Sequence, residues 1–166
     1  MTDQIPSNND PTPAHGRPFV PETFFPPEPP RTARIWLEPL GPQHNDADYA
    51  AWMSSIEHIH ATPGFPDGNW PHEMTPEENL GDLVMHADHF ARSLGFTYTV
   101  RSTQDDDVVG CVYIYPSKDA GMDADVKSWV RVSHADLDAE LWMTVSNWLK
   151  QAWPFRPDRI AYEARG

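Results

Sequence analysis

Short apolar and alternating runs in the middle of the chain predict three consecutive strands, over residues 96–100, 108–115 and 124–132. Side chains of a strand point to opposite faces in turn, so a period of two indicates a sheet with two different faces. The turn-forming run 104–107 lies between the first two strands and predicts an antiparallel hairpin. We therefore expect a sheet at the centre of the fold.

Apolar positions that recur three and four residues apart predict three helices. These segments are 46–61, 76–94 and 134–152. The second helix has the clearest start, because Thr75, Pro76 and Glu78 combine a capping box with a proline in the first turn. Two further strands are expected at 34–40 and 159–163, which gives the order strand, helix, helix, three strands, helix, strand.

The N-terminal part of the chain has a different composition, because nine of the 18 prolines lie in residues 1–31. Proline fixes φ and removes a backbone donor, which disfavours helices and sheet interiors. We therefore divide the chain into a proline-rich tail or arm, 1–31, and a domain, 32–166. Residues 1–16 are expected to be a disordered tail, and 19–27 an arm that packs its phenylalanines on the domain, or a ligand for a proline-recognising module. These phenylalanines are Phe19, Phe24 and Phe25.

Charge and cysteine content limit the partners and the compartment. The formal net charge is −13, with only 12 lysines and arginines, which argues against nucleic acids and acidic membranes as partners. Cys111 is the only cysteine, so an intrachain disulfide is excluded and a reducing, cytoplasmic location is expected. We expect Cys111 to be a buried structural thiol, and we see no signal peptide or membrane span in the sequence.

Three stretches together resemble the GNAT acyl-CoA N-acyltransferases. They are the hairpin FTYTVR…VVGCVYIY, the strand VKSWVRV, and the helix AELWMTVSNWLKQAWPF followed by DRIAYEA. The resemblance covers about residues 31 to 166 and implies an α/β fold of the α+β type, with a mixed, mainly antiparallel sheet flanked by helices. It also implies transfer of an acyl group from acetyl-CoA or another acyl-CoA to a primary amine, with a small-molecule amine as partner. The implied mechanism is direct attack of the neutral amine on the thioester.

Two departures from the family pattern favour an alternative function. The family carries a glycine-rich loop that holds the CoA pyrophosphate after its fourth strand, but the matching stretch here is HADLDAEL. Carboxylates at a helix start, from Asp136, Asp138 and Glu140, repel phosphate, and no glycine allows close backbone approach. The resemblance also ends at the fifth strand. In the family, the next element is a helix that carries a tyrosine, which protonates the leaving thiolate. The alternative is therefore a catalytically degenerate GNAT-fold binding or assembly protein.

The resemblance assigns candidate roles to several residues. His58 and His60, near the expected acceptor pocket, and Asp125, on the polar face of the third strand, are candidate proton acceptors. For the two histidines, the alternative is a solvated helix C-terminus.

Cofactor binding is assigned to the end of the third strand and the following turn. The residues are Val130, Arg131, Val132 and Ser133. Arg131 is the best candidate for an anion contact, with a cross-strand salt bridge as the alternative.

Two further features complete the expectations. Asp82, His86 and His89 share one helix face, which we expect to be polar and solvated; we predict no metal site there. The last strand, 159–163, has no downstream sequence in this chain to cover its edge. Either the N-terminal arm covers this edge within the same chain, or the same strand of a second copy pairs with it across a two-fold axis, and we expect the homodimer.

Overall fold

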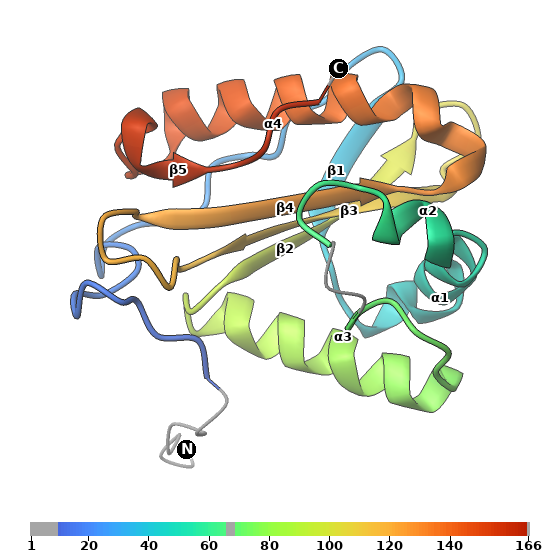
Figure 1. Cartoon of the computed structure of the whole chain (residues 1–166), viewed down its shortest axis with the longest axis horizontal. Coiled ribbons are helices and arrows are strands. Elements are labelled where there is room, and N and C mark those ends of the chain that lie inside the picture. The colour runs from blue at the N-terminus through green and yellow to red at the C-terminus, as the bar shows by residue number, and fades with distance from the viewer. Residues whose placement is uncertain (1–9, 66–68, 166) are drawn as a thin grey trace.

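The computed structural model describes residues 10–65 and 69–165, and its centre is a five-stranded sheet (Figure 1). The strands lie in the order in which they occur in the chain, and β4 and β5 are parallel whereas the other neighbours are antiparallel. The strands are β1 (Ile35–Pro39), β2 (Phe96–Ser102), β3 (Val108–Tyr115), β4 (Ala124–Val130) and β5 (Ile160–Ala161). The expected mixed, mainly antiparallel sheet of an α+β fold is confirmed.

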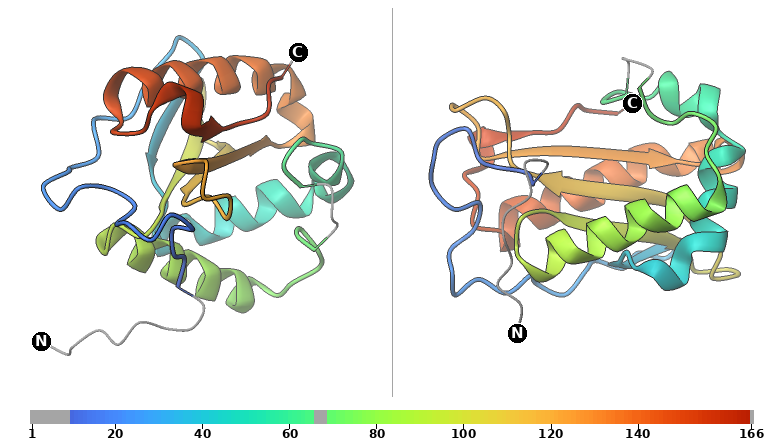
Figure 2. Two further views of the ribbon diagram at one scale, coloured as in Figure 1. Left: turned by 60° about the vertical axis from the view of Figure 1, so that its left-hand side comes forward. Right: turned by 90° about the horizontal axis from the view of Figure 1, so that it is seen from below.

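Helices cover both faces of this sheet (Figures 1 and 2). One face carries α1 (Asn45–Met53), α2 (Ile56–His60) and α3 (Pro76–Ala91), and the other carries α4 (Asp138–Ala152). Three short 3-10 helices lie between these elements. They are η1 (Pro42–His44), η2 (Val132–Leu137) and η3 (Pro157–Arg159). The capping box at the start of α3 is present, because Thr75 and Glu78 bond to each other's backbone N–H.

Each face of the sheet has its own apolar core. On the α4 side, Leu141, Val145 and Leu149 are fully buried against the sheet. On the opposite side, Trp52 of α1 and Trp129 of β4 are fully buried. Burial of one such side chain stabilises the fold by about 1.5–3 kcal/mol, so both helical layers contribute substantially to folding.

The N-terminal segment packs more extensively than its composition predicts. Phe19 is buried and its ring centroid lies 5.1 Å from that of Phe155, and Phe24 is partly buried, but Phe25 is 86% exposed, contrary to expectation. The expectation of a disordered tail to residue 16 is wrong for residues 10–16: Asp10 accepts two hydrogen bonds from Arg92, at 2.9 and 3.0 Å. Residues 1–9 of that tail lie outside the described residues.

Three element boundaries differ from the predictions for identifiable reasons. The helix expected over 46–61 is broken between α1 and α2. At the break, Ser54 Oγ donates to the Ala51 carbonyl, and this side-chain bond competes with the backbone hydrogen bond that a continuous helix would form. The last helix begins only at Asp138, because the chain first forms η2, with a non-helical His134. The last strand has two residues instead of five, since η3 takes up the start of the expected segment.

Candidate active site

A cavity of about 480 Å³ lies between α3, the loop that follows α2, and strands β3 and β4. Cavities of about 300–1,000 Å³ are typical of small-molecule sites. Its walls combine aromatic and carboxylate side chains. These are Phe65, Trp70, Tyr113, Asp48, Asp82 and Asp125. Lys118 and Lys127 also line it, so the cavity offers opposite charges together with flat apolar surfaces.

The floor of the cavity comes from neighbouring positions of β3 and β4. Tyr113 is paired with Lys127 across the strands, and Tyr115 with Asp125. Tyr113 is held in place because its hydroxyl accepts a hydrogen bond from Trp129 Nε1 at 3.0 Å. Asp125, a predicted proton acceptor, therefore lies in the cavity lining, at the polar face of β4 where the alternation of the sequence placed it.

One wall of the cavity is the polar face of α3, which contradicts the expectation of a solvated face. His89 is buried and His86 is half-buried, whereas the apolar Val84 of the same helix is 50% exposed. Tyr115 explains this orientation, because its hydroxyl lies 2.9 Å from His86 Nδ1 and 2.8 Å from His89 Nδ1. A tyrosine hydroxyl can donate one hydrogen bond and accept another, so it satisfies both imidazoles.

His86 reaches the cavity in its neutral form. Burial, together with the neighbouring His89, lowers the pKa of His86 to about 4. The ring lines the cavity, and the Thr97 hydroxyl lies 3.2 Å from its Nδ1. A neutral imidazole in a cavity is a hydrogen-bonding group and a candidate proton acceptor. The i, i+4, i+7 spacing of Asp82, His86 and His89 pointed to this helix face, but nothing in the sequence identified Tyr115 as its partner.

Asp48 of α1 supplies a buried carboxyl group to the same cavity. Its side chain accepts a hydrogen bond from Asn79 Nδ2 at 3.1 Å, and Asn79 Oδ1 in turn accepts one from Trp52 Nε1 at 3.1 Å. Burial raises the pKa of Asp48 to about 6, and the nearby Asp82 adds to this effect. Sequence reasoning missed Asp48, because a single acid in the first turn of a helix reads as a capping residue.

The two predicted histidines do not line the cavity. His60 Nε2 lies 2.6 Å from the carbonyl oxygen of Pro71, so this side chain holds the loop between α2 and α3. His58 is half-buried in α2, and its own carbonyl accepts a hydrogen bond from Thr62 Oγ1 at 2.9 Å. Of the three predicted proton acceptors, the cavity therefore contains only Asp125.

The predicted cofactor residues already have partners within the protein. Arg131 donates to Asp107 at 3.2 Å, which is the cross-strand salt bridge weighed as the alternative. The Val132 N–H donates to Ser55 Oγ at 2.8 Å, and Ser133 Oγ lies 2.8 Å from His134 Nδ1. Val130 is buried in the core. In this conformation the Arg131 guanidinium, the Val132 N–H and the Ser133 hydroxyl each have a partner within the protein.

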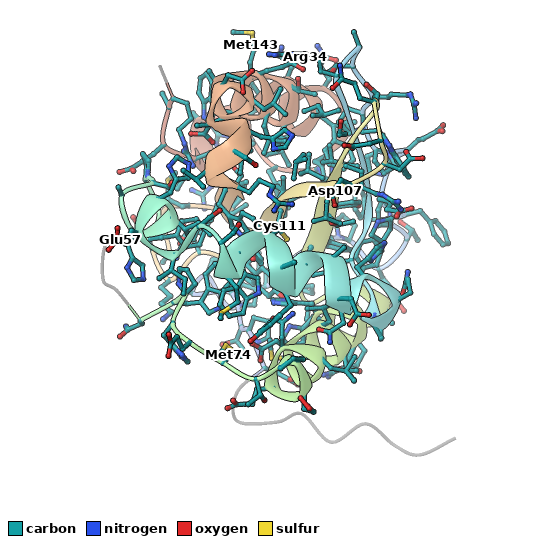
Figure 3. The ribbon with its side chains drawn as sticks, turned by 90° about the vertical axis from the view of Figure 1, so that its right-hand side faces the viewer. Arg34, Glu57, Met74, Asp107, Cys111 and Met143 are labelled. Carbon is teal, nitrogen blue, oxygen red and sulfur yellow. The ribbon has the colours of Figure 1, made fainter. Side chains whose placement is uncertain are left out.

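The acidic residues at the start of α4 are paired with arginines. Arg34 contacts Asp136 at 3.0 Å and Glu140 at 2.9 Å, and Arg165 contacts Asp138 at 3.0 Å. Figure 3 shows Arg34 beside this helix, with Cys111 beneath α1 in the interior, as expected for a structural thiol. A second cavity, of about 470 Å³, lies at this helix start and is lined by Asp136, Asp138 and Arg165.

Within residues 10–65 and 69–165, no group of three or more histidine, cysteine, aspartate or glutamate side chains is arranged to hold a metal ion. Across the same residues, every helix is too short or too polar to cross a lipid bilayer.

The fold, a mixed sheet covered by helices on both faces, is shared with solved acetyltransferases. The ribosomal-protein-S5-alanine acetyltransferase from Vibrio fischeri matches with a TM-score of 0.59 and 13% identity, over 76% of this chain and 69% of that one. An acetyltransferase from Salmonella typhimurium that modifies the N-terminal serine of L7/L12 matches with a TM-score of 0.58 and 10% identity, over 74% and 67%. The microcin C7 self-immunity acetyltransferase MccE matches with a TM-score of 0.56 and 8% identity, over 72% and 63%.

The chain therefore has the GNAT fold, as its sequence resemblance predicted, and spans about two thirds of the length of these structures. By sequence alone, it matches no family model and no curated protein.

Proposed function

We propose that this protein transfers an acyl group from acyl-CoA to a primary amine bound in the 480 Å³ cavity. The observation that carries the proposal is the lining of that cavity, where three carboxylates and several aromatic rings surround one space beside β4. An ammonium group is attracted both by carboxylates and by the faces of aromatic rings. Two solved structures of the same fold contain coenzyme A or acetyl-CoA, which supports acyl-CoA as the donor.

The residues on the amine side have distinct roles in this proposal. Trp70 and Phe65 give apolar surfaces for the body of the amine, and Asp125 and Asp82 hold the ammonium group. Asp48, with a pKa of about 6, is ionised at neutral pH and takes the proton that the ammonium must lose before its nitrogen can attack. His86 is a second acceptor in the same lining.

The residues on the donor side do not fit an acyl-CoA in this conformation. The Val132 N–H is bonded to Ser55, and the buried guanidinium of Arg165 lies beside β4. We therefore derive no step through the donor. The same observation favours a second candidate function, a binding protein of this fold that holds an amine without modifying it.

An acyl-transfer assay separates the two candidates. Free thiol release from acetyl-CoA is followed with a panel of primary amines, for the wild type and for Asp48→Asn and Asp125→Asn. Asp46→Asn is the matched control, because Asp46 is an exposed acid on the same helix as Asp48. We expect turnover that falls at least ten-fold in the first two variants and is unchanged in the control. Amine binding by calorimetry without any turnover would support the binding protein instead.

A further inference from the structure

We propose that the 480 Å³ cavity selects an α-amino acid with an apolar side chain, because Lys118 and Lys127 bind the carboxylate of the same molecule whose ammonium group the aspartates hold. The inference rests on the proposed function, which takes this cavity as the acceptor site. It narrows the acceptor from any primary amine to a zwitterion. The evidence is the distribution of charged and aromatic side chains within the cavity.

The two lysines of the cavity differ from most cations of this protein. Seven of the nine arginines form ion pairs with carboxylates. Among the residues that the structure describes, the side chains of Lys118 and Lys127 form neither an ion pair nor a hydrogen bond, although Asp82 and Asp125 line the same cavity. The positive charges of the cavity are therefore available to a ligand.

Lys127 is held over the aromatic wall of the cavity. Its Nζ lies 6.0 Å from the centroid of the Phe65 ring. Its alkyl stem runs close beside Gly64, where a Cβ atom would lie 3.3 Å from Lys127 Cγ. Gly64 has a φ of +100°, a conformation that favours glycine. The loop that follows α2 passes over β4 in Figure 1, and it therefore positions this lysine while leaving room for its side chain.

Asp125 and Lys127 present opposite charges from one strand. They lie two residues apart on β4, so their side chains point to the same face, about 6.6 Å apart along the strand. Their partners on β3, Tyr115 and Tyr113, also line the cavity. In an α-amino acid, the ammonium and the carboxylate are bonded to the same carbon atom. One such molecule can contact both side chains at once, whereas a simple amine satisfies only Asp125.

The other charges of the cavity follow the same division. Lys118 is an exposed residue of the loop that joins β3 to β4, so both lysines lie on the side of the sheet. Asp48 and Asp82 enter from α1 and α3, on the side of the helices. An ammonium group between Asp82 and Asp125 therefore leaves the carboxylate of the same molecule directed toward the lysines.

Aromatic rings provide the surface for the side chain of the amino acid. The ring centroid of Trp70 lies 5.8 Å from that of Phe65 and 6.3 Å from that of Tyr113. Phe65 and Tyr113 also contact each other, at 6.3 Å. Apolar surface that leaves water against these rings stabilises the complex, whereas a polar side chain loses its hydration there. We therefore expect an aliphatic or aromatic side chain.

Calorimetric titration of the full chain with four probes tests the selection. They are L-phenylalanine, L-leucine and the two corresponding amino alcohols, in which a hydroxymethyl group replaces the carboxylate. At pH 7 we expect each amino acid to bind at least about ten-fold more tightly than its alcohol, a difference of about 1.4 kcal/mol. Equal affinities of the amino acids and their alcohols would overturn the proposal, and so would the absence of binding by all four probes.

The double variant Lys118→Met/Lys127→Met tests the residues. It removes both charges and keeps apolar stems of similar length, and both positions are exposed, so the core stays intact. Lys150→Met is the matched control, because Lys150 is the remaining lysine of the chain and lies exposed on α4, on the opposite face of the sheet. We expect the preference to fall below about two-fold in the double variant and to be unchanged in the control. A preference that persists in the double variant would overturn the proposal.

Thiol release from acetyl-CoA with the same probes separates this inference from the proposed function. Selective binding of the amino acids without thiol release would uphold the selection and count against acyl transfer. Thiol release that is equally fast with the amino acids and with their alcohols would uphold acyl transfer and overturn the selection.

Discussion

Replacement of Asp48 by asparagine should change how the stability of this protein depends on pH. Asp48 is buried and its pKa lies at about 6, against an ordinary value of 3.8. Between these two pH values the folded state holds a proton that the unfolded state has lost. The contribution of Asp48 to the free energy of unfolding is therefore greatest at low pH, and it falls as the pH rises through about 4 to 6.

The size of the effect follows from the difference between the two pKa values. A shift of about two units corresponds to about 3 kcal/mol of destabilisation at neutral pH, of which about 2 kcal/mol develops between about pH 4.5 and pH 7.5. Asparagine does not titrate, and its side-chain oxygen can still accept the hydrogen bond from Asn79. Relative to the wild type, Asp48→Asn should gain about 2 kcal/mol of unfolding free energy over this pH interval.

Urea unfolding followed by tryptophan fluorescence at both pH values measures this difference. Asp46→Asn is the control, because it removes an exposed carboxylate from the first turn of the same helix. The result that refutes the reasoning is a difference in unfolding free energy between Asp48→Asn and the wild type that stays constant with pH within about 0.5 kcal/mol, as for the control. The pKa of Asp48 would then not be raised in the folded protein.

Two further predictions concern the arm and the assembly. Phe19→Ala should lower the free energy of unfolding by about 3 kcal/mol, since it empties a buried aromatic site, whereas Phe25→Ala, at an 86% exposed position, should change it by less than about 0.5 kcal/mol; equal effects in thermal melts would contradict the packing. Light scattering at micromolar concentration should show a dimer that Ile160→Pro converts to a monomer, because proline removes a donor from the last strand; a monomeric wild type would rule out pairing through this edge.

The periodic parts of the fold could be predicted from the sequence, because strand alternation and the α3 capping box are local signals. The orientation of α3 could not. Leu80 and Val84 fit an apolar stripe, yet both are exposed, and Asn79 and His89 are buried instead. Their burial depends on partners from other elements, Asp48 and Tyr115, which no local pattern reveals.

Only some residues of the candidate site could be predicted from the sequence. Asp125 could be placed from strand alternation, because the face of a strand is set by residue parity. His58 and His60 were assigned from a family resemblance, but the structure places them in α2, outside the lining of the cavity. The burial of Arg165 could not be predicted, because its acceptors include Asp138, Pro63 and Ser128, which lie on separate segments of the chain.

The N-terminal segment links the two helical layers at one end of the sheet, since Asp10 is bound to Arg92 just after α3 and Phe19 stacks on Phe155 just after α4. The two layers do not therefore behave as independent units during unfolding. Unfolding of either helical layer removes one of the two attachment points of the N-terminal segment and so destabilises the other layer. We therefore expect denaturation to be a single cooperative transition. A proteolytic cut between these two anchors would separate that transition into two.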